Sequence, residues 1–165
     1  MSKGNSRSLL VLGGFGLAVA GAAWYGSRYS RGESPSQWYR HLETPSFSPP
    51  KEIYPVVWTT LYALMAWSGW RIWSAAPSRE RKQALRLWVT QLATNAKWSK
   101  YFFGEHSPTI ALADAVALEG MIFSYMKAAR KVDPAAAHAF IPYAAWVAFA
   151  TVLNSEIARL NPRES

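Results

Sequence analysis

The chain has 165 residues, of which 50% are hydrophobic and 15% aromatic, a length and composition that suit one domain with a sizeable core. Because cysteine is absent, disulfides, zinc–thiolate sites, iron–sulfur clusters and thiol nucleophiles are excluded. The net charge of +8 comes from Lys and Arg that flank apolar runs instead of forming one dense patch, so nucleic acid is not an expected partner.

The first apolar segment, residues 8–27, contains no charged residue. It is long enough to cross a bilayer, which needs about 20 apolar residues. A secretory signal is the competing interpretation, with Lys3 and Arg7 as the basic region and Ala18-Val19-Ala20 as the cleavage site. The segment is therefore a candidate membrane helix or a cleaved signal.

A long connection, residues 28–52, follows and can cover one end of a bundle. Its second half is stiffened by Pro45, Pro49 and Pro50, which favour extended backbone. Pro55 falls near the start of the next helix, where its missing N–H costs little. We therefore predict a lid loop over residues 28–52 that leads into a helix over residues 53–75.

Three further helices are predicted over residues 79–103, 108–131 and 135–160, separated by short turn signals. Residues 53–70 and 135–155 pass the length test for a membrane span. Residues 79–103 and 109–130 carry charges and would not be recognised as spans by hydropathy alone. Short connections between consecutive helices indicate an antiparallel all-α bundle.

The helix over residues 79–103 is amphipathic at about 100° per residue. One face contains Gln91, Asn95, Trp98 and Phe102, and the opposite face contains Lys82, Arg86, Lys97 and Lys100. Because cations in contact with hydrocarbon are costly, the cationic face should meet water, another chain or a headgroup region.

Two other helices carry aromatic stripes. Tyr54, Trp58, Leu61, Tyr62, Met65 and Gly69 share one sector, and Ala139, Tyr143, Trp146, Ala150 and Asn154 share another. Together with Asn95 and Trp98 they could line a pocket for a planar, mostly apolar ligand. The alternative is ordinary bundle core. The two inward amides, Asn95 and Asn154, require either mutual hydrogen bonds or ligand contacts, because an unpaired buried amide costs free energy.

The sequence offers few groups for acid–base or metal chemistry. His41, His106 and His138 lie on separate segments without metal-site spacing, so no metal site is expected. Asp114 lies within a predicted helix and should face inward as a structural hydrogen-bond acceptor. Pro142 should kink the last helix near His138.

Motif residues recur in register from about Trp38 to Asn161. They are Trp38-Tyr39, Pro45, Phe47, Pro49-Pro50, Pro55, Trp58, Leu61-Tyr62, Gln91-Leu92, Asn95, Trp98, Phe102-Phe103-Gly104, Asp114 and Pro142-Tyr143-x-x-Trp146-x-x-Phe149-Ala150-Thr151-x-Leu153-Asn154. This set resembles the TspO/MBR family, the tryptophan-rich sensory proteins and mitochondrial translocator proteins. The resemblance implies a single domain over residues 1–165, an all-α five-helix transmembrane bundle, usually a homodimer, in a bacterial or mitochondrial membrane. It favours residues 8–27 as a retained helix.

The resemblance also implies a pocket for tetrapyrroles such as protoporphyrin IX and haem and for benzodiazepine-like ligands, closed by the first loop. By matching position its residues are Trp38, Pro45, Trp58, Tyr62, Asn95, Trp98, Tyr143, Trp146, Ala150 and Asn154. Trp58 and Trp146 match tryptophans implicated in light-dependent porphyrin breakdown, so they are the candidate catalytic residues. No resident cofactor is required, and the porphyrin is a ligand. A non-enzymatic sensor or a transport-associated binding protein is the alternative.

Two departures from the family pattern affect the expected partners. No Tyr lies between Leu153 and Arg159, so the cholesterol consensus fails and sterol binding is not expected. The charges Lys97, Lys100 and Glu119 also suit a surface altered for solubility, which keeps a soluble variant as an alternative. Ten Lys and Arg fall on one side of the predicted bundle and eight on the other, so the positive-inside rule gives no orientation.

Overall fold

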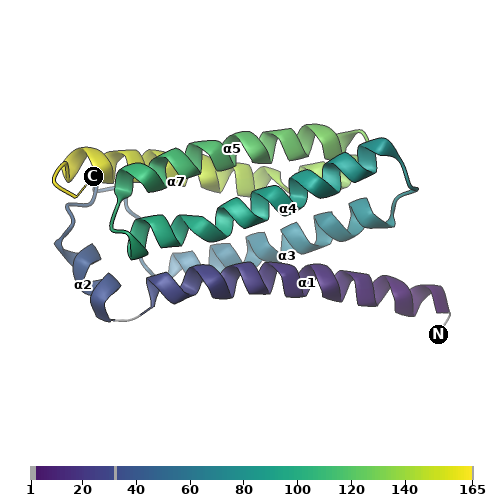
Figure 1. Cartoon of the computed structure of the whole chain (residues 1–165), viewed down its shortest axis with the longest axis horizontal. Coiled ribbons are helices and arrows are strands. Elements are labelled where there is room, and N and C mark those ends of the chain that lie inside the picture. Colours follow the sequence, from purple (N-terminus) through teal and green to yellow (C-terminus); the bar gives the residue numbers. More distant parts are fainter. Residues whose placement is uncertain (1–2, 32, 165) are drawn as a thin grey trace.

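A computed structural model describes residues 3–31 and 33–164. Its elements are α1 (Lys3–Ser30), α2 (Glu33–His41), α3 (Ile53–Ser74), α4 (Arg79–Ser99), the π-helical turn η1 (Lys100–Gly104), α5 (Pro108–Arg130), α6 (Pro134–His138) and α7 (Ile141–Leu160). The long helices α1, α3, α4, α5 and α7 lie side by side along one axis (Figure 1). No strand occurs in the described ranges. The predicted all-α bundle is confirmed.

The helix boundaries follow local capping chemistry. The Ser78 side chain accepts from Arg81 N at the start of α4, and the Ser107 side chain accepts from Ile110 N at the start of α5. The predicted kink in the last helix is a full interruption between α6 and α7. Pro142 has no N–H to donate to the carbonyl of His138, so α-helical bonding cannot continue through this point.

The prediction of an uninterrupted lid loop over residues 28–52 is wrong in its first half. Helix α1 continues to Ser30, and α2 occupies residues 33–41. The helical conformation lets neighbouring Trp38 and Tyr39 both pack on Phe102, with ring centroids 5.5 and 6.2 Å away. Residues 42–52 contain the prolines and are non-helical, as expected.

The hydropathy assignment of the membrane spans also needs correction. Among the described helices, three are long and apolar enough to cross a membrane: residues 8–30, 108–130 and 134–160. The α5 segment qualifies despite Asp114 and Glu119, because the residues around these two carboxylates are otherwise apolar. The α3 segment has a lower mean hydropathy because tryptophan and tyrosine count little on that scale, although their rings are large and mostly apolar. Its 22 residues carry one charge, Arg71, and are still long enough for a span.

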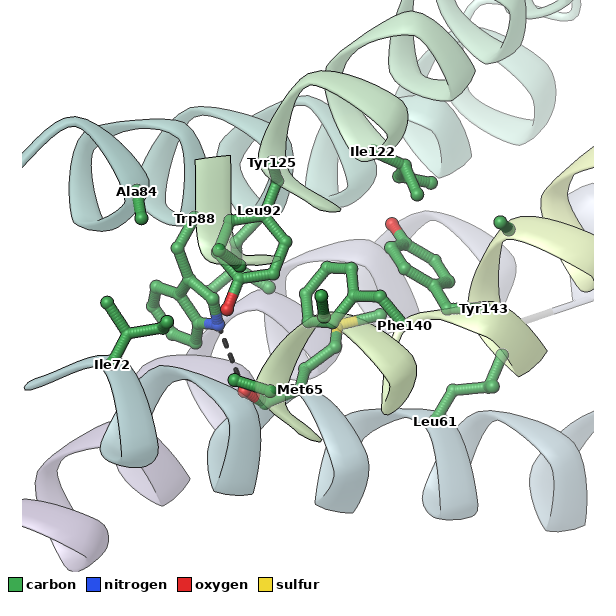
Figure 2. Close-up of a cluster of buried hydrophobic side chains, with 14 of the residues drawn as sticks. Leu61, Met65, Ile72, Ala84, Trp88, Leu92, Ile122, Tyr125, Phe140 and Tyr143 are labelled. Carbon is green, nitrogen blue, oxygen red and sulfur yellow. Dashed lines mark hydrogen bonds between the residues drawn. The ribbon is translucent and has the colours of Figure 1, made fainter. Parts of the chain in front are cut away.

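The main core lies where α3, α4, α5 and the α6–α7 junction meet. Figure 2 shows Trp88 of α4, Tyr125 of α5 and Phe140 converging above Met65 of α3. The Trp88 indole Nε1 donates to the carbonyl oxygen of Met65 at 2.9 Å, so this buried polar group is satisfied. The Tyr125 and Phe140 rings are 4.3 Å apart. This core joins α3, α4, α5 and the α6–α7 junction.

Gly69 permits the close approach of α1, α3 and α4. A Cβ at this position would lie 2.6 Å from the Phe15 ring and 2.8 Å from Trp88. We expect Gly69→Ala to lower the free energy of unfolding by about 1–3 kcal/mol, the usual cost of overpacking. Thermal unfolding in detergent measures the effect. Gly120→Ala is the matched control, since nothing lies within 4 Å of its Cβ, and an equal loss in both variants would contradict the packing argument.

One end of the bundle is fastened by Asp133 in the connection between α5 and α6. Its Oδ2 accepts from Arg71 Nε of α3 at 2.6 Å, and its Oδ1 accepts from the backbone N–H groups of Ala135 and Ala136 at 2.9 and 3.3 Å. The hydrogen bond from Arg71 and the capping bonds hold the pKa of Asp133 below its usual range, against the opposing effect of burial. The carboxylate therefore joins α3 to the start of α6.

This ion pair should make stability depend on acidity. Because the folded pKa is depressed, the stabilisation is present above the unfolded pKa of about 3.9 and is lost as the pH falls through the lower folded value. We expect Asp133→Asn to lose about 1–2 kcal/mol at pH 7, since the Arg71 side chain is partly exposed and screened. The difference between variant and wild type in unfolding midpoint should shrink between pH 5 and pH 3. A pH-independent difference would contradict this assignment.

Candidate functional site in the aromatic bundle interior

Four of the predicted pocket residues meet between α3, α4 and α7, and we name Trp58, Tyr62, Asn95 and Tyr143 the central cluster. The Trp58 ring lies 5.4 Å from Tyr62 and 6.3 Å from Tyr143. The Tyr62 hydroxyl donates to Asn95 Oδ1 at 3.1 Å. The helical spacing of Trp58 and Tyr62 places both rings on one face of α3. Flat apolar walls thus enclose a tyrosine–amide pair.

The Tyr143 hydroxyl is the least satisfied polar group of this cluster. Its side chain is fully buried, and the hydroxyl faces the Asn95 amide without forming a hydrogen bond of good geometry in the described part of the chain. Figure 2 shows the hydroxyl pointing away from the α3 backbone, toward the side of the bundle where Ile122 lies. A buried hydroxyl without a partner costs free energy, so it is available to a ligand or a water molecule.

Trp146 lies at the edge of the central cluster. Its ring is 5.8 Å from Tyr54 of α3 and 5.6 Å from Phe149. It also borders a shallow, almost wholly apolar groove of about 390 Å³ between α3 and α7. That groove is lined by Val56, Val57, Thr60, Leu61, Pro142, Ala145 and Trp146. Val56, Thr60, Pro142 and Ala145 are exposed, so this groove lies on the outer surface of the bundle and not inside it.

The other two predicted tryptophans form a second group under the lid, which we name the lid cluster: Trp38, Trp98, Phe102 and His106. Trp98 stacks on Phe102 with ring centroids 4.9 Å apart, and Trp38 lies 5.5 Å from Phe102. The Trp38 ring also stacks on His106 at 4.5 Å. The π-helical turn η1 aims Phe102 into this cluster, where it is only 2% exposed. The two halves of the predicted pocket are therefore adjacent but distinct.

The C-terminal residues hold the lid in place. Asn161 Oδ1 accepts from the backbone N–H of Glu43, and Asn161 Nδ2 donates to the Glu43 carbonyl, both at 2.9 Å. The Trp38 indole Nε1 donates to Glu164 Oε2, also at 2.9 Å. We call these three hydrogen bonds the C-terminal latch. They join segments more than 100 residues apart, so they tie the lid to the end of α7.

The remaining predicted pocket residues, Asn154, Pro45 and Ala150, belong to neither cluster. Asn154 is buried, and its Nδ2 donates to the carbonyl of Pro108 at 2.7 Å, which fastens α7 to the start of α5. Pro45 is half-buried in the non-helical lid segment, and its carbonyl accepts from Ser48. Ala150 is half-buried on α7. The two inward amides Asn95 and Asn154 therefore bond to different partners and not to each other.

Sequence reasoning overlooked several residues of this region. His106 carries no expected role in the sequence, and in the structure its ring stacks on Trp38. Its φ of 51° lies in the left-handed region, which few non-glycine residues adopt, although His is among those enriched there. Asn161 enters the sequence analysis only as the end of the motif range, with no expected contact to the lid. Glu164 carried no signal at all, because an acceptor for an indole N–H cannot be read from local sequence.

Two carboxylates lie within α5, close to the pocket helices. Asp114 and Glu119 are half-buried, and Asp114 Oδ2 and Glu119 Oε2 have no hydrogen-bond partner within the described residues. The prediction that Asp114 is a structural hydrogen-bond acceptor is thus not supported by a hydrogen bond among the described residues.

Outside the membrane helices, Tyr39 of α2 lies beside the lid cluster. Burial there raises the pKa of its hydroxyl.

Comparison with known proteins bears on the identity of this arrangement. The model of the TspO/MBR family matches residues 15–160. The chain is 36% identical over 150 residues to the translocator protein of Homo sapiens, covering 90% of this chain and 88% of that protein. It is 37% identical over 132 residues to protein CrtK of Rhodobacter capsulatus, covering 79% and 82%.

A third relative is the tryptophan-rich sensory protein of Cereibacter sphaeroides, 36% identical over 127 residues that cover 77% of this chain and 78% of that protein. The matched region includes every predicted pocket residue, from the lid to α7. Together with the apolar spanning helices, these matches identify a membrane protein. The chain belongs to the TspO/MBR family of membrane proteins.

Proposed function

We propose that this protein binds a planar, mostly apolar tetrapyrrole such as protoporphyrin IX or haem between α3, α4 and α7, under the lid. The observation that carries the proposal is the convergence of Trp58, Tyr62 and Tyr143 from two helices around the Asn95 amide. Aromatic walls offer large contact area to a flat macrocycle. The same walls suit benzodiazepine-like ligands, which also present fused and pendant aromatic rings.

The polar groups of the central cluster would fix the orientation of a bound ligand. Tyr62 and Asn95 already form a hydrogen bond, while the buried Tyr143 hydroxyl lacks a good partner. A few fixed polar groups in an apolar site are what gives a ligand a single orientation. We therefore expect pyrrole nitrogens or propionate oxygens to engage Tyr143 and Asn95, with the ring faces on Trp58.

The tryptophans also support a photochemical role. Trp58 is inside the central cluster, and Trp146 borders it and the apolar groove. An indole beside a photoexcited porphyrin is a chemically reasonable electron donor, with molecular oxygen as the oxidant that breaks the macrocycle. Such chemistry needs no acid–base dyad. We propose light-dependent porphyrin degradation on this basis.

A non-enzymatic role in sensing or transport is the second proposal. The relatives are named translocator and sensory proteins. In this proposal the lid, which the C-terminal latch joins to the end of α7, is the segment that moves when a ligand enters. The homodimer implied by the family resemblance also remains a prediction. Light scattering of the detergent-solubilised protein, at several protein concentrations, measures that oligomeric state.

Titration of the purified protein with protoporphyrin IX, in the dark and then under illumination, tests both proposals. We expect saturable quenching of tryptophan fluorescence, followed by light-dependent loss of the porphyrin absorption band faster than in protein-free detergent. Saturable quenching without that loss would leave the binding role and exclude the photochemical one. Absence of saturable quenching would mean that the central cluster is only bundle core.

A further inference from the structure

The outward face of α4 carries three cations that the described part of the chain leaves without an ion-pair partner. Arg79, Lys82 and Arg86 follow helical spacing and share one face. All three side chains are exposed, and with Gln83 they line a shallow groove. The ion pairs found among the described residues use other cations. We name this feature the α4 cation groove.

Two neighbouring cations at the same end of the bundle, Arg71 and Arg81, already have partners within the protein. Arg71 is paired with Asp133. Arg81 donates to the carbonyls of Ile72 and Trp73, at 3.3 and 2.6 Å, and its guanidinium lies 4.9 Å from the Trp73 ring. Their charged groups therefore have structural roles. The three side chains of the α4 cation groove have none, so their charge is available to an external anion.

The length of α4 places this groove at headgroup depth. The 21 residues of α4 give a rod of about 32 Å at 1.5 Å per residue, close to the roughly 30 Å of the hydrocarbon core. An α4 that crosses this core therefore has its first turn at the headgroup region. Trp73, 48% exposed at the end of α3, is the kind of side chain that concentrates at this interface.

The neighbouring helix α1 exposes apolar side chains at the level of the α4 cation groove. Phe15 packs on Trp88 with ring centroids 4.8 Å apart, and Gly26 approaches Ser99, so α1 and α4 run parallel (Figure 1). The same register brings Leu10 to the level of the α4 cation groove. Leu10 and Leu17 are 77% and 76% exposed and one heptad apart, so they form a stripe on α1. The α4 cation groove and the exposed leucines thus lie at the same end of two neighbouring helices.

We propose that the α4 cation groove binds the phosphate of an anionic phospholipid headgroup, with the acyl chains along the exposed leucine stripe of α1. Guanidinium groups form paired, charge-assisted hydrogen bonds with phosphate oxygens. Cations that face the membrane without a counter-charge are costly, and a bound headgroup removes that cost. Free phosphate would satisfy the cations but not the leucines. The proposal is independent of the tetrapyrrole site.

Lipid-dependent thermal stability of the full-length protein in neutral detergent tests this proposal. The probes are dioctanoyl phosphatidylglycerol, dioctanoyl phosphatidylcholine with the same chains, and sodium phosphate. Phosphatidylglycerol should raise the unfolding midpoint saturably, and the other two should not. In R79Q/K82Q/R86Q the apparent Kd for phosphatidylglycerol should rise on the order of 100-fold. Each cation near an anionic lipid surface contributes about fivefold in affinity, and three are removed.

The matched control is R31Q/R40Q/R163Q, which removes three exposed charges near the lid and lowers the net charge equally. Its Kd for phosphatidylglycerol should stay within twofold of wild type. Equal weakening in both triple variants, or equal protection by sodium phosphate, would overturn the proposal. Circular dichroism verifies folding. If the triple variant does not fold, R86Q alone should weaken binding about fivefold, and an unchanged Kd there would overturn the proposal as well.

Discussion

Replacing both Trp58 and Trp146 by Phe should reduce the rate of light-dependent porphyrin loss at least tenfold while the protein still folds. Phe retains a flat apolar ring but removes the indole, a far better electron donor than benzene. Trp58 contacts Tyr62 and Tyr143, and Trp146 contacts Tyr54, so each substitution leaves part of the aromatic wall in place. Affinity should fall by no more than about tenfold, or 1.4 kcal/mol. The porphyrin absorption band reports both quantities without relying on tryptophan fluorescence.

Trp24→Phe is the matched control for this variant. Trp24 is 61% exposed on α1, far in the sequence from the central cluster, and it contacts Arg28. Its replacement should leave binding and light-dependent loss unchanged. The rate of porphyrin loss is measured at saturating porphyrin. If the double variant binds tenfold more weakly but still degrades bound porphyrin at the wild-type rate, the role of the two indoles is contradicted. Equal losses in the control would point to nonspecific photochemistry.

The sequence predicted the helical bundle well because helix periodicity, caps and turn residues act locally. The start of α4 at Arg79 after the Ser78 cap, and of α5 at Pro108 after Ser107, are of this kind. The amphipathic division of α4 is also confirmed, since Gln91 and Asn95 are buried while Lys82, Arg86 and Lys97 on the opposite face are exposed. Such features require no knowledge of which helices become neighbours.

What the sequence did not predict depends on contacts between distant segments. Helix α2 forms where Trp38 can reach Phe102, and the π-helical turn η1 sets that reach. Neither has a local signal. The separation of the pocket residues into a central and a lid cluster has the same origin, because Trp98 shares a face with Asn95 but η1 draws it toward Phe102. Asn154 looked like a pocket amide until its partner, the Pro108 carbonyl, was known.

Removing the C-terminal latch by Asn161→Ala should open the lid without unfolding the bundle. The substitution breaks both hydrogen bonds to the Glu43 backbone. At about 0.5–1.5 kcal/mol each, these two bonds favour the closed lid by about 1–3 kcal/mol, or roughly 5- to 150-fold in the opening equilibrium. Amide hydrogen exchange of residues 37–44 should accelerate by that factor, while exchange in α3 and α5 stays unchanged.

Glu156→Ala is the control for this prediction. It breaks the pair between Glu156 and Arg159 on the same helix but touches no lid residue, so exchange in residues 37–44 should not change. Glu164→Ala removes the acceptor of the Trp38 indole and should accelerate exchange less than Asn161→Ala, because it breaks one hydrogen bond instead of two. Dissociation of bound porphyrin should accelerate in the same order. Unchanged exchange in Asn161→Ala would show that the stacking of Trp38 on Phe102 and His106 holds the lid without the latch.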